Sequence, residues 1–203
     1  MNNKNNLLSQ LYMLKLFGYN YINKLNVKNN IDALLPDNIF ELNQRISNCN
    51  LCELSKKCTS KSLYDSKSYS DIIILVPEVL SNNKLNILKN VLKDYLDINI
   101  DNVVIINIIK CITNNTEINE YVFDICKDYT VKEIDIISAK VILCFGNIYK
   151  YIVKNDLNIG EFTIYNKSKL FYLNDLNLLL RNPSIMVENK NIFYKIKHEM
   201  EKI

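Results

Sequence analysis

Hydrophobic and polar positions alternate in blocks along this chain, and the blocks predict elements of two kinds. Four short apolar runs, rich in β-branched residues, have the length and composition of strands buried on both faces. They span residues 71–76, 101–107, 140–146 and 170–173. Apolar residues recur with helical spacing over 85–96 and 121–132. This alternation predicts an α/β fold, a three-layer α/β/α sandwich around a central, mainly parallel four-stranded sheet.

The first quarter of the chain has a helical pattern without strands. Apolar residues repeat with helical spacing over 7–17, and Gly18 stands where such a helix would end. A polar run over 20–30 follows, and Pro36 then opens a second helix that leads to the first cysteines. We expect residues 1–47 to form a helical extension and residues 48–203 an α/β domain. The Ser-, Lys- and Tyr-rich segment 59–70 is expected to be a loop.

Composition sets the class of protein without giving its chemistry. The chain has 203 residues, 48% of them hydrophobic, which is enough for a buried core, and its net charge of +3 permits nucleic-acid binding without arguing for it. No apolar run approaches the roughly 20 residues of a membrane span, and the N-terminus lacks a secretory apolar core. We therefore expect a cytoplasmic, monomeric protein. In that compartment its six cysteines are expected to be metal ligands or buried thiols rather than disulfides.

Four cysteines have the pattern of a metal centre. Cys49 and Cys52 bracket two residues, so that one tight turn can direct both sulfurs to one point, while Cys111 and Cys126 must be brought there by folding. Four thiolates suit either a structural zinc or an iron–sulfur cluster. Fourteen residues separate the second pair, and this spacing favours the cluster over the two short knuckles of a zinc ribbon. Cys58 follows Cys52 closely enough to replace a ligand.

The remaining candidates lie at the carboxyl ends of the predicted strands, where sites collect in parallel sheets. Glu78 follows the first strand and Asn107 ends the second; each could either bind a ligand or cap a neighbouring helix or loop. Lys110 and Arg181 could contact phosphate or only water. Cys144 lies within the third strand and is expected to be a core thiol.

Five motifs follow one another along the chain. They are Cys49-x-x-Cys52-x-Leu54, Asn107-Ile108-Ile109-Lys110-Cys111, the fourteen-residue gap to Cys126, Val141-Ile142-Leu143-Cys144-Phe145-Gly146, and Leu179-Leu180-Arg181-Asn182-Pro183. In this order they resemble the family 4 uracil-DNA glycosylases, which hold a 4Fe-4S cluster, and the resemblance covers the chain from about Cys49 to the C-terminus. It implies that the four cysteines hold the cluster and that the ancestral reaction is hydrolysis of the N-glycosidic bond of uracil in DNA, as in base excision repair.

The same resemblance assigns roles to several residues. It implies that Asn107 reads the Watson–Crick edge of the flipped base, that Glu78 lies near the sugar, and that Lys110 or Arg181 contacts phosphate. It also makes DNA the expected partner. Because most base-reading elements of the family are absent, we expect DNA binding to be electrostatic and weakly selective.

The chain departs from the family at the catalytic positions. The family's Gly-Glu-Ala-Pro-Gly loop corresponds to 77–81 here, which keeps only the carboxylate, and no stacking Phe follows. Asp175, followed by Leu176, occupies the position of the family's histidine, where a carboxylate would repel the uracil anion. Another register would place Asn182-Pro183-Ser184 there, also without a histidine, and His198 is expected on the surface of a terminal helix. Two hypotheses follow: a DNA glycosylase that hydrolyses the N-glycosidic bond of a flipped uracil or another damaged base, or a non-catalytic iron–sulfur descendant that binds DNA or is structural. In either case we expect uracil excision to be absent or very slow.

Overall fold

The computed structural model describes residues 35–64, 70–112 and 119–202. The chain divides into two compact units, residues 1–30 and 31–203, and every described residue belongs to the second unit. The helix expected over 7–17 lies outside the described residues.

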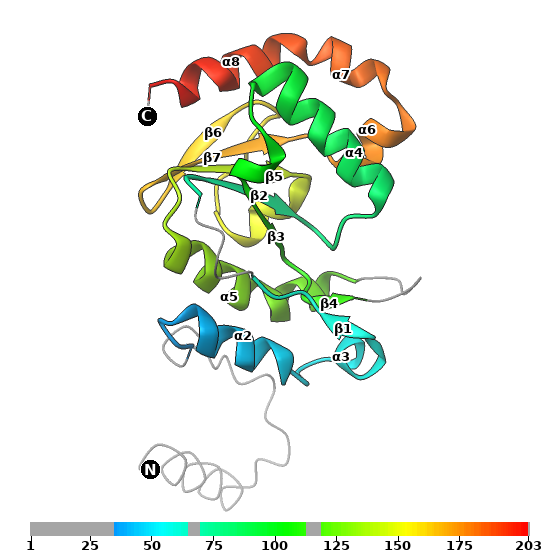
Figure 1. The fold of residues 1–203 in the computed structure, drawn as a ribbon, viewed down its shortest axis with the longest axis vertical. Coiled ribbons are helices and arrows are strands. Elements are labelled where there is room, and N and C mark those ends of the chain that lie inside the picture. Colours follow the sequence, from blue (N-terminus) through cyan, green and yellow to red (C-terminus); the bar gives the residue numbers. More distant parts are fainter. Residues whose placement is uncertain (1–34, 65–69, 113–118, 203) are drawn as a thin grey trace, which may run out of the picture. The chain divides into compact units, whose positions relative to one another are not determined.

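The second unit is built on a mainly parallel sheet with the strand order β3-β2-β5-β7-β6. Its four parallel strands are the four that the apolar runs predict, so the α/β fold class is confirmed (Figure 1). The fifth strand, β6, pairs antiparallel with β7 at the edge of the sheet. The strands are β2 (Ile72–Val76), β3 (Val104–Asn107), β5 (Val141–Phe145), β6 (Phe162–Tyr165) and β7 (Ser168–Leu173).

Alternating residues of the central strands bury two separate cores. Ile73 and Leu75 of β2 face one layer of helices, and Ile74 and Val76 face the other. The first layer holds α5 (Glu120–Ile137) and the 3₁₀ helix η4 (Asn147–Tyr151). The second layer holds α4 (Asn82–Val91), its π-helical continuation η2 (Leu92–Leu96), α6 (Leu176–Arg181), α7 (Ser184–Glu188) and α8 (Lys190–Met200). A 3₁₀ turn, η3 (Ile100–Asn102), leads into β3.

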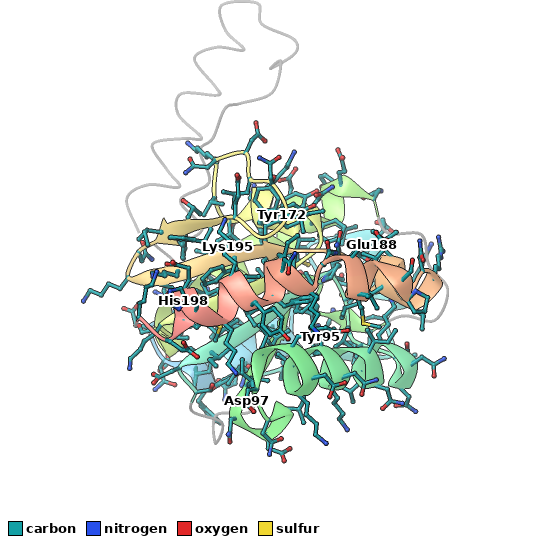
Figure 2. The ribbon with its side chains drawn as sticks, turned by 90° about the horizontal axis from the view of Figure 1, so that it is seen from above. Tyr95, Asp97, Tyr172, Glu188, Lys195 and His198 are labelled. Atoms are coloured by element: carbon teal, nitrogen blue, oxygen red, sulfur yellow. The ribbon has the colours of Figure 1, made fainter. Side chains whose placement is uncertain are left out.

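Helix α8 packs along η2 in the second layer. The rings of Tyr95 and Phe193 are 5.0 Å apart between centroids, and Lys197 lies 3.5 Å from Asp97. Figure 2 shows Tyr95 and Asp97 beside this helix, with His198 and Lys195 along it. Among the described helices, none is long and apolar enough to cross a membrane.

A smaller layer packs against α5 and contains the segment that carries the first cysteines. It consists of α2 (Ile39–Ser47), α3 (Glu53–Lys57) and a short antiparallel pair, β1 (Ser60–Lys61) with β4 (Cys111–Ile112). Figure 1 shows these elements together next to α5. Leu42 and Ile46 of α2 bury against Tyr129 of α5, because both lie on the apolar side of an amphipathic helix. Thus α2, which the sequence pattern grouped with the N-terminal extension, packs on the α/β unit.

Candidate metal centre

Five of the six cysteines lie in or beside this smaller layer. Cys49 follows α2, and Cys52 and Cys58 flank the two ends of α3. Cys111 begins β4, and Cys126 lies on the buried face of α5. Cys52, Cys111 and Cys126 belong to one hydrophobic cluster, against which Cys58 packs. Folding therefore brings Cys52, Cys111 and Cys126, which are far apart in sequence, into one cluster.

Cys126 lies close to the thiols of the CxxC turn. Burial raises the pKa of Cys126, the backbone N–H of Lys110 opposes this shift, and the sulfurs of Cys52 and Cys49 raise the pKa further because like charges repel. Only 3% of Cys126 is exposed. These three residues thus form one group of neighbouring thiols.

Cys58 and Cys111 form a second group with a lysine between them. The β1–β4 register places Lys61 opposite Cys111, and the Lys61 ammonium lies 3.2 Å from the Cys111 sulfur. Burial lowers the pKa of Lys61, because it disfavours the charged amine. The interactions with the sulfurs of Cys111 and Cys58 together outweigh burial, so the pKa of Lys61 is raised. Burial raises the pKa of Cys111 to about 12, against the lowering effect of the Lys61 ammonium.

Two hollows in the surface reach the thiols. One, of about 610 Å³, is lined by Arg45, Cys49 and Tyr129, whose hydroxyl contacts the Cys49 sulfur. The other, of about 430 Å³, is lined by Cys49, Cys58 and Lys61. Cys49 therefore has solvent on two sides.

The thiols are neighbours but are not closed around a single ion. Within 35–64, 70–112 and 119–202, no three His, Cys, Asp or Glu side chains are arranged so that they could hold one metal ion. Cys144 is separate from both groups: it is fully buried on β5, where its sulfur faces the Gly146 carbonyl at 3.8 Å.

A buried ion pair lies directly behind Cys126. The Lys110 ammonium is 2.5 Å from the Glu133 carboxylate and donates to the Asn107 carbonyl at 2.5 Å. Lys110 is 3% exposed and Glu133 is 1% exposed. Burial raises the pKa of Glu133, and the Lys110 ammonium lowers it. This position does not fit the phosphate contact expected of Lys110, because its charge is already paired inside the protein.

The Asn107 amide is also held by protein groups. Its oxygen accepts from the Ser62 hydroxyl at 3.0 Å, and its nitrogen donates to the Ile109 carbonyl at 2.9 Å. Ser62 follows β1, and its backbone N–H donates to the Lys110 carbonyl. The amide expected to read a base thus joins the cysteine-bearing segment to the end of β3.

The other candidates at the carboxyl edge have local partners. Lys84 donates to the Glu78 carboxylate at 2.8 Å. The Asp175 carboxylate caps α6 by accepting from the Asn177 N–H at 2.6 Å. Gly146 follows β5 with φ of 96°, and a Cβ there would lie 3.0 Å from an Asp175 oxygen, so that Asp175 also covers this turn.

Arg181 and His198 are both on the surface. Arg181 is exposed in the last turn of α6, so its guanidinium is free to meet solvent or a ligand. His198 is exposed on α8, in agreement with the sequence-based expectation, and its nearest acidic partner is Glu201 at 3.9 Å.

Three residues that the sequence analysis passed over take part in this site. Lys61 and Ser62 fall in a segment expected to be an unstructured loop, where nothing marked them. Glu133 stands seven residues after Cys126, which is two helical turns and therefore the same face of α5. A carboxylate on the apolar face of a helix was the one signal that could have identified it.

The chain matches no family model, and no curated protein aligns with it significantly. The resemblance to family 4 uracil-DNA glycosylases therefore depends on the motifs themselves.

Proposed function

We propose that this chain is an iron–sulfur protein related to the family 4 uracil-DNA glycosylases, in which Cys49, Cys52, Cys111 and Cys126 hold a 4Fe-4S cluster. The observation that supports the proposal is that Cys52 before α3, Cys111 of β4 and Cys126 of α5 are buried in one hydrophobic cluster, and that the charge of Cys49 acts on Cys126. Free thiols in this number are compatible with a reducing cytoplasm.

The residues fit such a group chemically. Thiolates are the usual ligands of iron–sulfur clusters, and hydrogen bonds to their sulfurs tune the cluster potential. The Lys110 N–H supplies such a bond at Cys126, and the Lys61 ammonium supplies one at Cys111. When bound, the cluster would link the CxxC turn to β4 and α5, and it would carry one electron.

We further propose that uracil excision is absent or very slow. A glycosylase needs a donor where negative charge develops on uracil, and loss of one such donor typically costs about 10² to 10³ in rate. The Asp175 side chain is a carboxylate that caps α6 and is not a donor. The Asn107 amide already forms hydrogen bonds to Ser62 and Ile109. Glu78 is paired with Lys84. These contacts favour the non-catalytic alternative, with DNA as a weakly selective partner.

Metal analysis tests the first part of the proposal. Protein purified without oxygen should be brown and contain iron and sulfide near four atoms each per chain, the composition of the proposed cluster. The matched variant Cys144→Ala removes the one thiol outside both groups and should keep the iron. Stoichiometric zinc without iron in native protein would refute the cluster.

An excision assay tests the second part. Cluster-loaded protein is incubated with single- and double-stranded oligonucleotides that contain uracil, and the wild type is compared with Asp175→His. We expect no measurable excision by the wild type. Excision at an ordinary enzymatic rate, unchanged in Asp175→His, would show that another residue supplies the electrophile.

A further inference from the structure

Strand β6 leaves one edge of the main sheet open. It pairs with β7 on one side, and among the described strands none lies on its other side (Figure 1). The opposite edge strand, β3, is buried at three of its four residues, whereas β6 is exposed at Phe162 and Ile164. Residues 162–165 contain no charge and no proline, although proteins commonly use both to protect an exposed edge. This edge is therefore a surface to which another strand can pair.

The backbone groups of Phe162 and Ile164 point away from the sheet. The Tyr172 N–H donates to the Glu161 carbonyl at 3.0 Å, so residue 161 faces β7. Residues of an antiparallel strand alternate between facing the partner strand and facing outward, so Phe162 and Ile164 face outward. In the part of the chain that the structure describes, their N–H and C=O groups have no hydrogen-bond partner. Each residue thus offers one donor and one acceptor to a new strand.

The side chains of the same two residues form an apolar strip along this edge. Phe162 is 38% exposed and Ile164 is 59% exposed. The Phe162 ring lies 5.3 Å from the ring of Phe171 between centroids, and the Lys169 ammonium lies 5.2 Å from the Phe162 centroid. These contacts fix the position of the ring. A strand that covered the strip would remove its apolar surface from water.

A second copy of this chain fits the edge because the edge is self-complementary. Phe162 and Ile164 lie on either side of Thr163. A two-fold axis through Thr163 therefore places each Phe162 opposite the Ile164 of the other copy, where the two residues can exchange both backbone hydrogen bonds. The charges at the two ends of β6 also match. Glu161 precedes the strand, Lys167 follows it and both are exposed, so antiparallel pairing brings opposite charges together.

We propose that β6 pairs antiparallel with β6 of a second copy, so that two five-stranded sheets join into one and the protein is a reversible homodimer. This inference is independent of the proposed cluster and of DNA binding, and it replaces the monomer expected from the sequence. Four residues of β6 from each copy make a small contact beside the roughly 1,200 to 2,000 Å² that stable interfaces bury. The dimer therefore dissociates on dilution.

Sedimentation velocity of the whole chain over a dilution series, under reducing conditions, tests the association. Wild type should pass from dimer to monomer as it is diluted. Ile164→Lys introduces an ammonium into the apolar strip of both copies, so it should raise the dissociation constant by about tenfold or more. Val187→Lys makes the same kind of change on α7, where Val187 is 68% exposed, and should leave the dissociation constant unchanged. Thermal unfolding verifies that both variants are folded.

Cross-linking tests the register of the two strands. With the axis at Thr163, this residue faces its own copy in a non-hydrogen-bonded pair, with Cα atoms about 4.5 Å apart, which is within the range of a disulfide. Mild oxidation should therefore convert Thr163→Cys into a covalent dimer. Lys167→Cys, exposed in the turn between β6 and β7, should not cross-link. Wild type oxidised in the same way measures any cross-link through the native cysteines.

Wild type that stays monomeric at every concentration would overturn the proposal. A dimer that persists in folded Ile164→Lys, with no cross-link in Thr163→Cys, would overturn it as well, because association would then use another surface. Should Ile164→Lys not fold, the difference in cross-linking between Thr163→Cys and Lys167→Cys decides the question by itself.

Discussion

Lys61 places a positive charge against the sulfur of a proposed cluster ligand. Because a nearby cation favours the reduced, more negative cluster, Lys61→Met should lower the reduction potential by tens of millivolts, on the order expected for one partly screened charge. The methionine keeps an apolar stem of similar length. Potentiometric titration followed by electron paramagnetic resonance measures the shift. Lys57→Met, on the exposed side of α3, is the control and should leave the potential in place.

The Lys110–Glu133 pair makes a prediction about stability. Lys110→Met leaves a buried carboxylate without its partner, which typically costs about 3 to 5 kcal/mol. Urea unfolding of the wild type and the variant measures the difference. The double variant Lys110→Met/Glu133→Leu should recover most of the loss, because no unpaired charge remains. An unchanged free energy of unfolding in Lys110→Met would show that the pair does not hold α5 against β3.

The pH dependence of that variant follows from the direction of the Glu133 shift. Burial raises the folded-state pKa of Glu133 above its unfolded value, and without Lys110 the pKa should rise further. Between the two pKa values the folded state binds more protons than the unfolded state, so stability falls as pH rises through this window. Lys110→Met should therefore gain stability relative to wild type on acidification from about pH 8 to about pH 5. If the free energy of unfolding changed equally with pH in the wild type and in Lys110→Met, this prediction would be wrong.

At the residue scale, sequence reasoning located the thiols and missed what surrounds them. The CxxC turn and the spaced pair are marked by residue type, and the structure buries Cys52, Cys111 and Cys126 in one cluster. The roles expected of Lys110 and Asn107 came from the family resemblance and from their place at a strand end, and neither gives information about their partners in this chain. Both are occupied by residues distant in sequence, Glu133 and Ser62, whose approach depends on tertiary packing.

At the scale of elements, the end of α5 has backbone strain that a glycine would remove. Ser138 ends this helix in the left-handed region, with φ of 52°, and its N–H donates to the Ile134 carbonyl at 2.9 Å. Glycine adopts this conformation without a Cβ penalty, so Ser138→Gly should stabilise the protein by about 0.5 to 1 kcal/mol. That corresponds to roughly 1 to 4 °C in Tm for a chain of this size.

The comparison variant for this helix end is Ser138→Ala. It keeps the Cβ and loses the hydroxyl bond to the Asp135 carbonyl, so its Tm should be at or below that of wild type. Equal Tm values for the glycine and alanine variants would mean that the left-handed conformation costs nothing here.

The elements that sequence patterns predicted share one property: each buries a regular apolar face. The four central strands and the helices α4 and α5 were recognised for this reason. The strands β1 and β4 have two residues each, which is too short for any period. Edge strand β6 exposes Phe162 and Ile164, so its pattern resembles a surface loop. The conformation of these missed strands is thus set by pairing rather than by burial.

At the scale of the whole molecule, the proposed contact with DNA should be weak and sensitive to salt. Phosphate contacts release counterions, so the logarithm of the association constant should fall linearly with the logarithm of salt concentration. Arg181→Ala should weaken binding equally for uracil- and thymine-containing strands and reduce the slope by about 1. Fluorescence anisotropy over a salt series measures both.

The control for DNA binding is Lys195→Ala, on α8, which should leave the slope unchanged (Figure 2). An affinity for DNA that does not change with salt concentration and is higher for uracil-containing strands would show that a base-reading pocket exists.

The distance along the chain between the first and last proposed ligands also determines how long after Cys49 the ribosome adds Cys126. Cys49 precedes Cys126 by 77 positions. At roughly 5 to 20 residues per second, the ribosome needs about 4 to 15 s to make that stretch. The CxxC turn therefore leaves the exit tunnel seconds before its partners exist, and its thiols must stay reduced in the nascent chain. On arrested ribosomes, maleimide should label Cys49 until Cys126 has emerged and then lose access; early protection would mean that the turn captures metal alone.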